Sequence, residues 1–74
     1  NINLWKCNKI TDEGLKYLGA AGTVHTINLG YCEKITDEGL KYLAGVQNIN
    51  LWKCNKITDE GLKYLAGAQK ILRF

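Results

Sequence analysis

Residues 2–18 read INLWKCNKITDEGLKYL, and residues 49–65 read the same seventeen letters. Between them, residues 27–43 read INLGYCEKITDEGLKYL and differ only at Gly30, Tyr31 and Glu33. The period is 25 residues from the first copy to the second and 22 residues from the second to the third. Repetition at a period of this length is typical of solenoids and other stacked arrays, so the repeat decides the fold.

The repeats divide the 74 residues into units that together form one domain. We place the repeats at 1–23, 24–45 and 46–67, followed by a partial fourth over 68–74. The three additional residues of the first repeat fall in its segment 19–23, which reads GAAGT where the other repeats have Ala-Gly.

Within each repeat, the spacing of apolar residues changes from that of a strand to that of a helix. The alternation of Ile27 and Leu29 predicts a short strand with one buried face. Leu40 and Leu43 are three residues apart and therefore share one face of a short helix. Elements this short are marginal in water, and stacked repeats bury them together. The sequence predicts an α/β solenoid with a parallel sheet on the concave side and short helices on the convex side.

The ends of the predicted helix have their own signals. Thr36 or Asp37 is expected to accept hydrogen bonds from the free amides of the first turn, where acidic side chains are also favourable. Gly45 is expected to provide the left-handed residue that ends the helix. Gly39 weakens the helix by up to about 1 kcal/mol relative to alanine, so close packing or a tight turn is expected to require it.

Composition excludes some classes of protein. Hydrophobic residues make up 46% of the chain and charged residues 23%, a balance typical of folded proteins. No run approaches the roughly 18 apolar residues of a membrane span, so no membrane association is expected. Seven acidic residues spread among ten basic ones argue against a nucleic-acid partner. The odd number of cysteines and the lack of a secretion signal favour a reducing, cytoplasmic location.

The full pattern of the second repeat runs from Val24 through Ile27, Leu29, Cys32 and Ile35-Thr36-Asp37-x-Gly39-Leu40 to Leu43. It resembles the leucine-rich repeat, and most closely the cysteine-containing subclass, whose signature joins L-x-L-x-x-C to I-T-D-x-G-L. The third repeat carries it from Val46 to Leu65, and the first from Ile2 to Leu18. Two departures are a unit shorter than is usual in the family, and Arg73 where the pattern has leucine.

This resemblance implies a non-catalytic surface for binding proteins. Similar arrays serve as substrate-recognition parts of ubiquitin ligase receptors, in which an F-box precedes the repeats, although these 74 residues hold no F-box. The near identity of the repeats leaves a second possibility open. The chain would then be a self-assembling structural repeat, natural or designed on a consensus, that associates end to end with copies of itself.

If Ile27 and Leu29 face the core, the side chains between them point to the concave face. The predicted binding residues are Asn3, Trp5, Thr26, Asn28, Asn48, Asn50 and Trp52, with Asn1, Lys70, Leu72 and Phe74 at equivalent positions. Exposed tryptophans beside amides are typical of binding hot spots, and the gap at Gly30 is expected to form a pocket between the indoles. Alternatively, the asparagines simply hydrogen-bond one another and the indoles lie flat on the sheet.

No constellation of residues predicts catalysis, a metal or a cofactor. Cys7, Cys32 and Cys54 recur at intervals of 25 and 22 residues, which suits a structural role as buried thiols better than zinc binding. His25 is the single histidine, and the chain has no serine. The acidic pairs at the helix starts, such as Asp37 and Glu38, are explained by capping. The chain is therefore not expected to be an enzyme.

Overall fold

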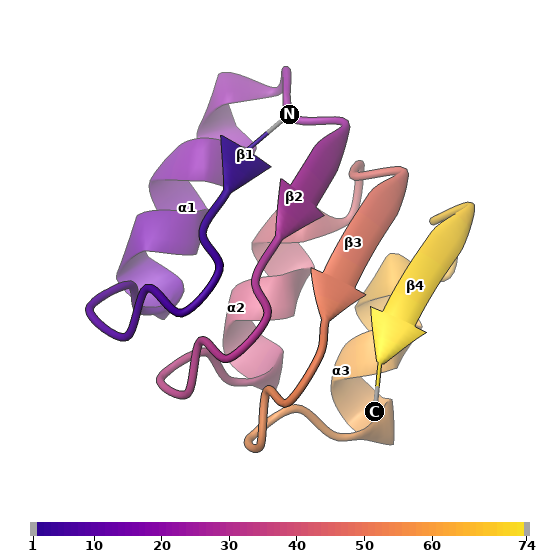
Figure 1. Cartoon of the computed structure of the whole chain (residues 1–74). Helices are drawn as coiled ribbons and strands as arrows, with labels where there is room; N and C mark the ends of the chain where they lie inside the picture. The colour runs from indigo at the N-terminus through magenta and orange to yellow at the C-terminus, as the bar shows by residue number, and fades with distance from the viewer. Residues whose placement is uncertain (1, 74) are drawn as a thin grey trace.

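The computed structural model describes residues 2–73 of the chain. Strands alternate with helices along the chain, and Figure 1 shows the strands side by side in one layer with the helices behind them. In order, the elements are β1 (Ile2–Asn3), α1 (Asp12–Ala21), β2 (Thr26–Asn28), α2 (Asp37–Leu40), β3 (Asn48–Leu51), α3 (Asp59–Leu62) and β4 (Lys70–Arg73). The helices α2 and α3 each continue into a 3-10 turn, η1 (Lys41–Leu43) and η2 (Lys63–Leu65).

The sheet is parallel and its strands follow chain order, β1-β2-β3-β4. Equivalent residues of successive repeats are paired, so Ile27 lies opposite Ile49 and Asn28 opposite Asn50. A repeating sequence produces this register because each strand presents the same apolar face to the same layer of helices. The predicted α/β solenoid is confirmed.

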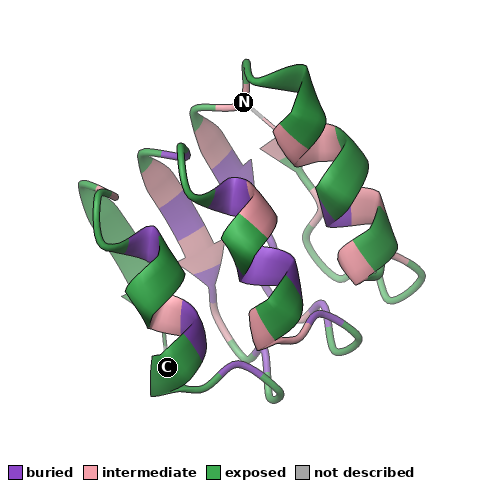
Figure 2. Ribbon diagram, turned by 180° about the vertical axis from the view of Figure 1, so that it is seen from behind, coloured by how far each residue is buried: buried purple, intermediate pink, exposed green. Residues whose placement is uncertain are grey.

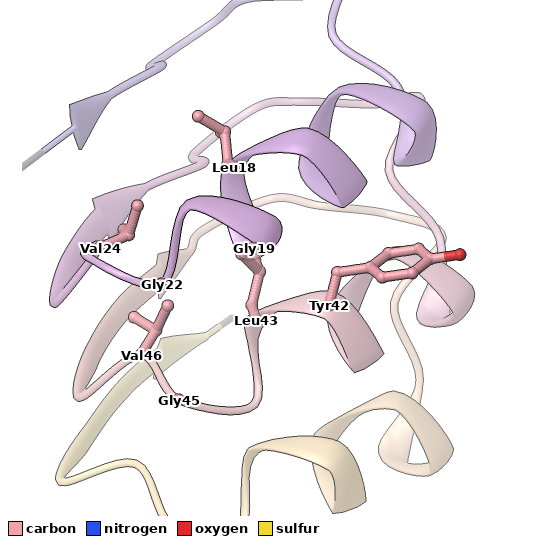
Figure 3. A pocket seen from close by; sticks show the side chains of 8 residues that line it. All are labelled: Leu18, Gly19, Gly22, Val24, Tyr42, Leu43, Gly45 and Val46. Carbon is pink, nitrogen blue, oxygen red and sulfur yellow. The ribbon is translucent and has the colours of Figure 1, made fainter.

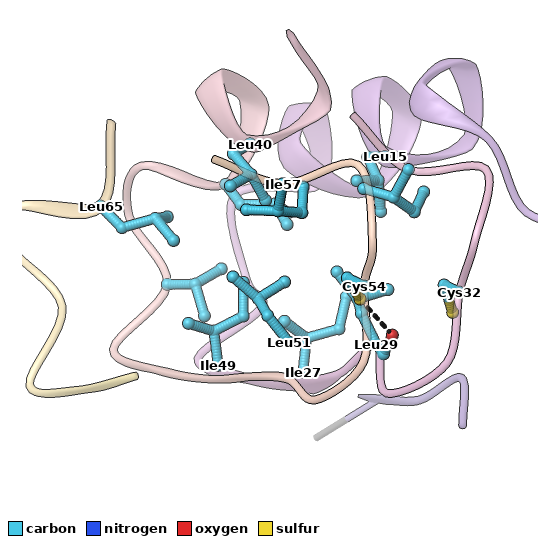
Figure 4. Packing of buried hydrophobic residues seen from close by; sticks show 13 residues of the cluster. Leu15, Ile27, Leu29, Cys32, Leu40, Ile49, Leu51, Cys54, Ile57 and Leu65 are labelled. Carbon is cyan, nitrogen blue, oxygen red and sulfur yellow. Dashed lines mark hydrogen bonds between the residues drawn. The ribbon is translucent and has the colours of Figure 1, made fainter. Parts of the chain in front are cut away.

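The core lies between the sheet and the helices (Figures 2 and 4). The middle repeats are buried most deeply, with Leu29 and Leu51 at most 1% exposed. Leu4 in the first repeat is half-buried, and all four residues of β4 are exposed. The buried residues are Leu15, Ile27, Leu29, Cys32, Ile35, Leu40, Leu43, Val46, Ile49, Leu51, Cys54, Ile57 and Leu65.

The aspartates at the helix starts bind the next repeat instead of capping their own helix. Asp12 accepts a hydrogen bond from the backbone N–H of Thr36 at 2.9 Å and a second one from the Thr36 hydroxyl. Asp37 makes the same two bonds to Thr58, with the backbone N–H at 2.7 Å. The expected capping is therefore wrong for Asp37. The side chain of Thr36 makes no cap bond either, whereas Thr58 accepts one from the backbone N–H of Glu60 at 3.3 Å.

These carboxylates explain the glycines at positions 39 and 61 in the second and third repeats. A Cβ atom on Gly39 would overlap Oδ1 of Asp12 and would lie 3.0 Å from a methyl carbon of Leu15. Gly61 has the same relation to Asp37 and Leu40. The expected close packing at Gly39 is confirmed, and its cause is the aspartate of the preceding repeat.

The longer first repeat places its additional residues in the helix. The helix α1 has ten residues, whereas α2 and α3 have four each before their 3-10 turns. Gly22 ends α1 in the left-handed conformation, with φ at 70°. The expectation that Gly45 has this conformation is wrong, because the 3-10 turn of the shorter repeat leaves through Ala44 with right-handed φ and ψ.

Arg73 replaces the leucine of the pattern and binds back to the third repeat. It pairs in register with Leu51 of β3, but its guanidinium donates to Oδ1 of Asp59 and to the carbonyl of Ile57, both at 2.9 Å. Asp59 is the equivalent of Asp12 and Asp37, which bind a threonine of the following repeat. In the third repeat, Arg73 takes the place of that threonine. A further repeat packed here in the same geometry would have to displace this side chain.

Replacing Gly39 by alanine is expected to lower the free energy of unfolding by about 2 kcal/mol, because the new methyl group overlaps the bound Asp12 carboxylate. Helix propensity alone would favour alanine by about 1 kcal/mol, so the two effects have opposite signs. Urea unfolding measures the difference. The control is Gly45→Ala, where no atom lies within 4 Å of the added carbon. A Gly39→Ala variant as stable as the wild type would contradict the packing described here.

Candidate functional site

The face of the sheet opposite the helices holds most of the predicted binding residues. Burial alternates along β3, where Ile49 and Leu51 are buried while Asn48 and Asn50 are half-buried. Thr26 and Asn28 flank buried Ile27 on β2 in the same way. The alternation follows from the strand geometry, which directs successive side chains to opposite faces.

An open groove runs across this face over β2, β3 and β4. Its volume is about 240 Å³, and its lining includes the side chains of every described strand position on that face of the three strands. The residues that line it are Thr26, Ile27, Asn28, Asn48, Ile49, Asn50, Lys70 and Leu72. The structure therefore brings Thr26, Asn28, Asn48 and Asn50 together, while Asn1 and Phe74 lie outside the described residues.

Asn3, Asn28 and Asn50 occupy the same position in successive repeats, at or next to the end of a strand. The side chain of each one stabilises the turn that follows the strand. Oδ1 of Asn28 accepts from the backbone N–H of Gly30 at 3.0 Å, and Oδ1 of Asn50 accepts from that of Trp52 at 2.8 Å. Asn3 makes the same bond to Trp5 at 3.0 Å. Within residues 2–73, no hydrogen bond joins these asparagine side chains to one another, so the alternative of mutually bonded asparagines is wrong.

The chain turns sharply just after these bonds. Lys6, Tyr31 and Lys53 have φ values of 62°, 64° and 60°, a left-handed conformation that side chains rarely adopt. The same conformation recurs in all three repeats although the residue type changes. The turn is therefore set by the position in the repeat, where the asparagine bond and the inter-strand hydrogen bonds hold it.

The indole of Trp5 occupies the space that a side chain at position 30 would take. A Cβ atom on Gly30 would overlap the indole of Trp5, and Gly30 is buried beneath it. The indole meets the ring of Tyr31 edge-on, with the ring centroids 4.9 Å apart. The expected pocket between Trp5 and Trp52 is therefore wrong at Gly30. Trp5 is still 40% exposed and Trp52 is half-buried, but neither indole lines the groove.

The cysteines form a second link between repeats, on the buried side. The thiol of Cys32 donates to the carbonyl of Leu4 at 3.1 Å, and that of Cys54 donates to the carbonyl of Leu29 at 3.0 Å (Figure 4). Burial raises the pKa of both thiols, which keeps them protonated as donors. The prediction of a buried thiol is wrong for Cys7, which is exposed because no strand of a preceding repeat packs against it within residues 2–73. The sequence indicated a weak donor but not the carbonyl that accepts from it.

A smaller cavity lies on the helical side, between the end of α1 and η1 (Figure 3). Its volume is about 60 Å³, and it is lined by Leu18, Gly19, Gly22, Val24, Tyr42, Leu43, Gly45 and Val46. Ligand pockets usually enclose about 300–1,000 Å³, so this cavity is a gap in packing between two helices of unequal length.

The described residues offer no centre for metal chemistry. Within residues 2–73, no three side chains of histidine, cysteine, aspartate or glutamate come together as ligands. His25 is exposed in the loop before β2. None of the described helices has the length and hydropathy needed to cross a membrane.

Comparison with known protein families identifies a match. A family described as Leucine Rich repeat matches residues 6–19, 23–44 and 53–66, which together make up more than half of the chain. No curated protein matches the chain.

Replacing Gly30 by alanine is expected to displace the indole of Trp5 and increase its exposure, because the added methyl group and the ring would overlap. In a Trp52→Phe background, Trp5 is the single tryptophan, so its fluorescence reports the change. We expect a red-shifted emission maximum and stronger quenching by acrylamide. Gly45→Ala in the same background is the control. Unchanged quenching of the Gly30→Ala variant would show that Trp5 does not cover Gly30.

The three cysteines are expected to react with a thiol reagent at very different rates. Cys7 should react as an exposed thiol, whereas Cys32 and Cys54 should react at least about a hundredfold more slowly, because they are buried and protonated. Mass spectrometry of the native protein over time identifies each modified residue. Equal rates at all three positions would contradict the buried thiol–carbonyl bonds.

Proposed function

Since the chain belongs to the leucine-rich repeat family, we propose that it is a non-catalytic protein-interaction module that binds its partner on the grooved face of the sheet. Repeats of this family generally mediate protein interactions, and its members are typically not catalysts. The observation that carries the proposal is the groove itself, whose lining combines polar side chains with the exposed Leu72. Such a mixture is typical of protein-binding surfaces.

The size of a stable interface indicates that the partner extends beyond the groove. A standard interface takes about 800 Å² from each protein, which is roughly a sixth of the 4562 Å² surface of this chain. Trp5 is 40% exposed, covers Gly30 two residues after Asn28 of the groove, and packs against Tyr31, which holds the indole in place. Aromatic side chains fixed in this way lose little entropy on binding and are common hot spots. We therefore assign Trp5 as the main apolar anchor and the groove as the polar part of the surface.

Substrate recognition for a ubiquitin ligase would be one use of such a module, and it stays a prediction. The proposal needs no F-box and no metal or cofactor. It requires a folded array with a free sheet face.

Filling the groove is expected to abolish partner binding. The variant Thr26→Tyr/Asn48→Tyr places two large side chains in the groove and removes only a long hydrogen bond of 3.4 Å between these residues. Tyrosine is favourable in strands, so the fold should persist. The control is Lys16→Tyr/Ala20→Tyr, which adds the same side chains to exposed positions of α1.

The measurement is quantitative affinity capture from an extract of the source cells with the wild type and both variants. We expect a set of proteins that the wild type and the α1 variant capture equally and that the groove variant loses by at least about tenfold. A captured set that is the same for all three proteins would overturn the proposal. Circular dichroism confirms that each variant is folded.

A further inference from the structure

We infer that the partner segment in the groove is acidic, and that its carboxylates bind a row of side-chain donors on β2, β3 and β4. This inference rests on the proposed function and specifies the chemistry of the partner. It depends on the orientation of two asparagine amides and on the distribution of charge over the two faces of the array.

The backbone fixes which way each amide is turned. A backbone N–H can only donate, so the atom of Asn28 that meets the N–H of Gly30 must be the oxygen. The same argument applies to Asn50 and the N–H of Trp52. Both amide nitrogens must then occupy the other position. Within residues 2–73, neither nitrogen donates a hydrogen bond, so both asparagines have donors available for a ligand in the groove that they line.

The donors form a compact set. Asn28 and Asn50 are register partners on neighbouring strands, which places them about 4.8 Å apart. Lys70 on β4 pairs with Asn48 and adds an ammonium group at the same groove. Leu72, which is exposed, provides apolar surface beside these donors. A glutamate or aspartate side chain complements both features of the groove. Its carboxylate can bind the donors, and its aliphatic carbon atoms can contact the leucine.

Among residues 2–73, no carboxylate lines the groove. Asp12 and Asp37 are bound to threonines between the repeats, and Asp59 binds Arg73. Glu38 and Glu60 pair with lysines of their own helices, at 2.8 and 3.0 Å. The remaining two acidic residues, Glu13 and Glu33, lie in α1 and in the turn after β2. The positive charge of Lys70 is therefore not compensated within the groove, and an acidic ligand meets no like charge there.

The same donors could accept a phosphate, but the surface favours a peptide over a nucleic acid. The lining holds a single basic residue, and the net charge of the chain is +3. Nucleic-acid binding depends on several phosphate contacts from basic side chains, which this groove does not provide. Neutral amide donors combined with one lysine suit isolated carboxylates on an otherwise uncharged segment.

The test titrates the labelled protein with a short peptide of alternating glycine and glutamate and follows the side-chain NH₂ signals by NMR. The matched peptide of glycine and glutamine keeps the shape and removes the charge. We expect the glutamate peptide to shift the NH₂ signals of Asn28 and Asn50 and to bind at least about tenfold more tightly than the glutamine peptide. Binding should weaken as salt is added.

Two single variants remove the donor and place a like charge in its position. Asn28→Asp and Asn50→Asp keep the oxygen that accepts from the backbone N–H, so the turn is retained, but they replace the NH₂ donor by a negatively charged oxygen. Each should weaken binding of the glutamate peptide by about tenfold. Lys70→Gln should also weaken it, whereas the matched control Lys16→Gln on α1 removes the same charge without effect.

Three outcomes would overturn the inference. The first is equal binding of the two peptides. The second is a shift confined to helix signals, which would assign the acidic peptide to the exposed lysines there. The third is tighter binding of a single-stranded oligonucleotide than of the glutamate peptide at the same asparagines. Any of these, together with groove-dependent capture of proteins from the extract, would leave the proposed function intact and reject its acidic partner.

Discussion

A carboxylate held between two repeats is the contact on which the rest of the structure depends. Asp37 reaches across to the backbone N–H and hydroxyl of Thr58, and Asp12 reaches Thr36 in the same way. A four-residue helix and a three-residue strand cannot bury enough apolar surface alone, so each repeat is stable only beside its neighbour. The aspartate ties the start of its own helix to the start of the helix in that neighbour. The carboxylate fits because the next repeat has a glycine at the point of contact. Gly39 faces Asp12 and Gly61 faces Asp37, and a side chain at either glycine would overlap the carboxylate.

The period of the sequence was sufficient to predict the parallel sheet, its register and the layer of helices. It also placed a packing requirement at Gly39. It assigned Asp37 to its own helix, however, because an acidic residue in a first helical turn is equally typical of a cap. Nothing within one repeat distinguishes a carboxylate turned toward its own amides from one turned toward the next repeat. Gly45 was misjudged for a related reason, since a tight 3-10 turn ends a short helix without a left-handed residue.

The sequence was sufficient to predict which residues form the candidate surface. It was not sufficient to predict which of their polar groups are available to a ligand. Alternation along a strand identifies Asn28 and Asn50 as residues on the face away from the helices, and the structure brings them into one groove. Their orientation depends on a turn that only the folded backbone defines, and that turn leaves the donors available to a ligand. The place of Trp5 over Gly30 likewise depends on which repeat lies beside which. The stacking of the repeats that stabilises the array therefore also shapes its binding face.

A double-mutant cycle between Asp37 and Thr58 tests the central claim most directly. Urea unfolding of the wild type, Asp37→Ala, Thr58→Val and the double variant gives the coupling free energy between the carboxylate and the hydroxyl. The account predicts a coupling of about 1 kcal/mol or more, since hydrogen bonds to charged groups are stronger than neutral ones. Additive losses, with no coupling between two residues 21 positions apart in the chain, would contradict it.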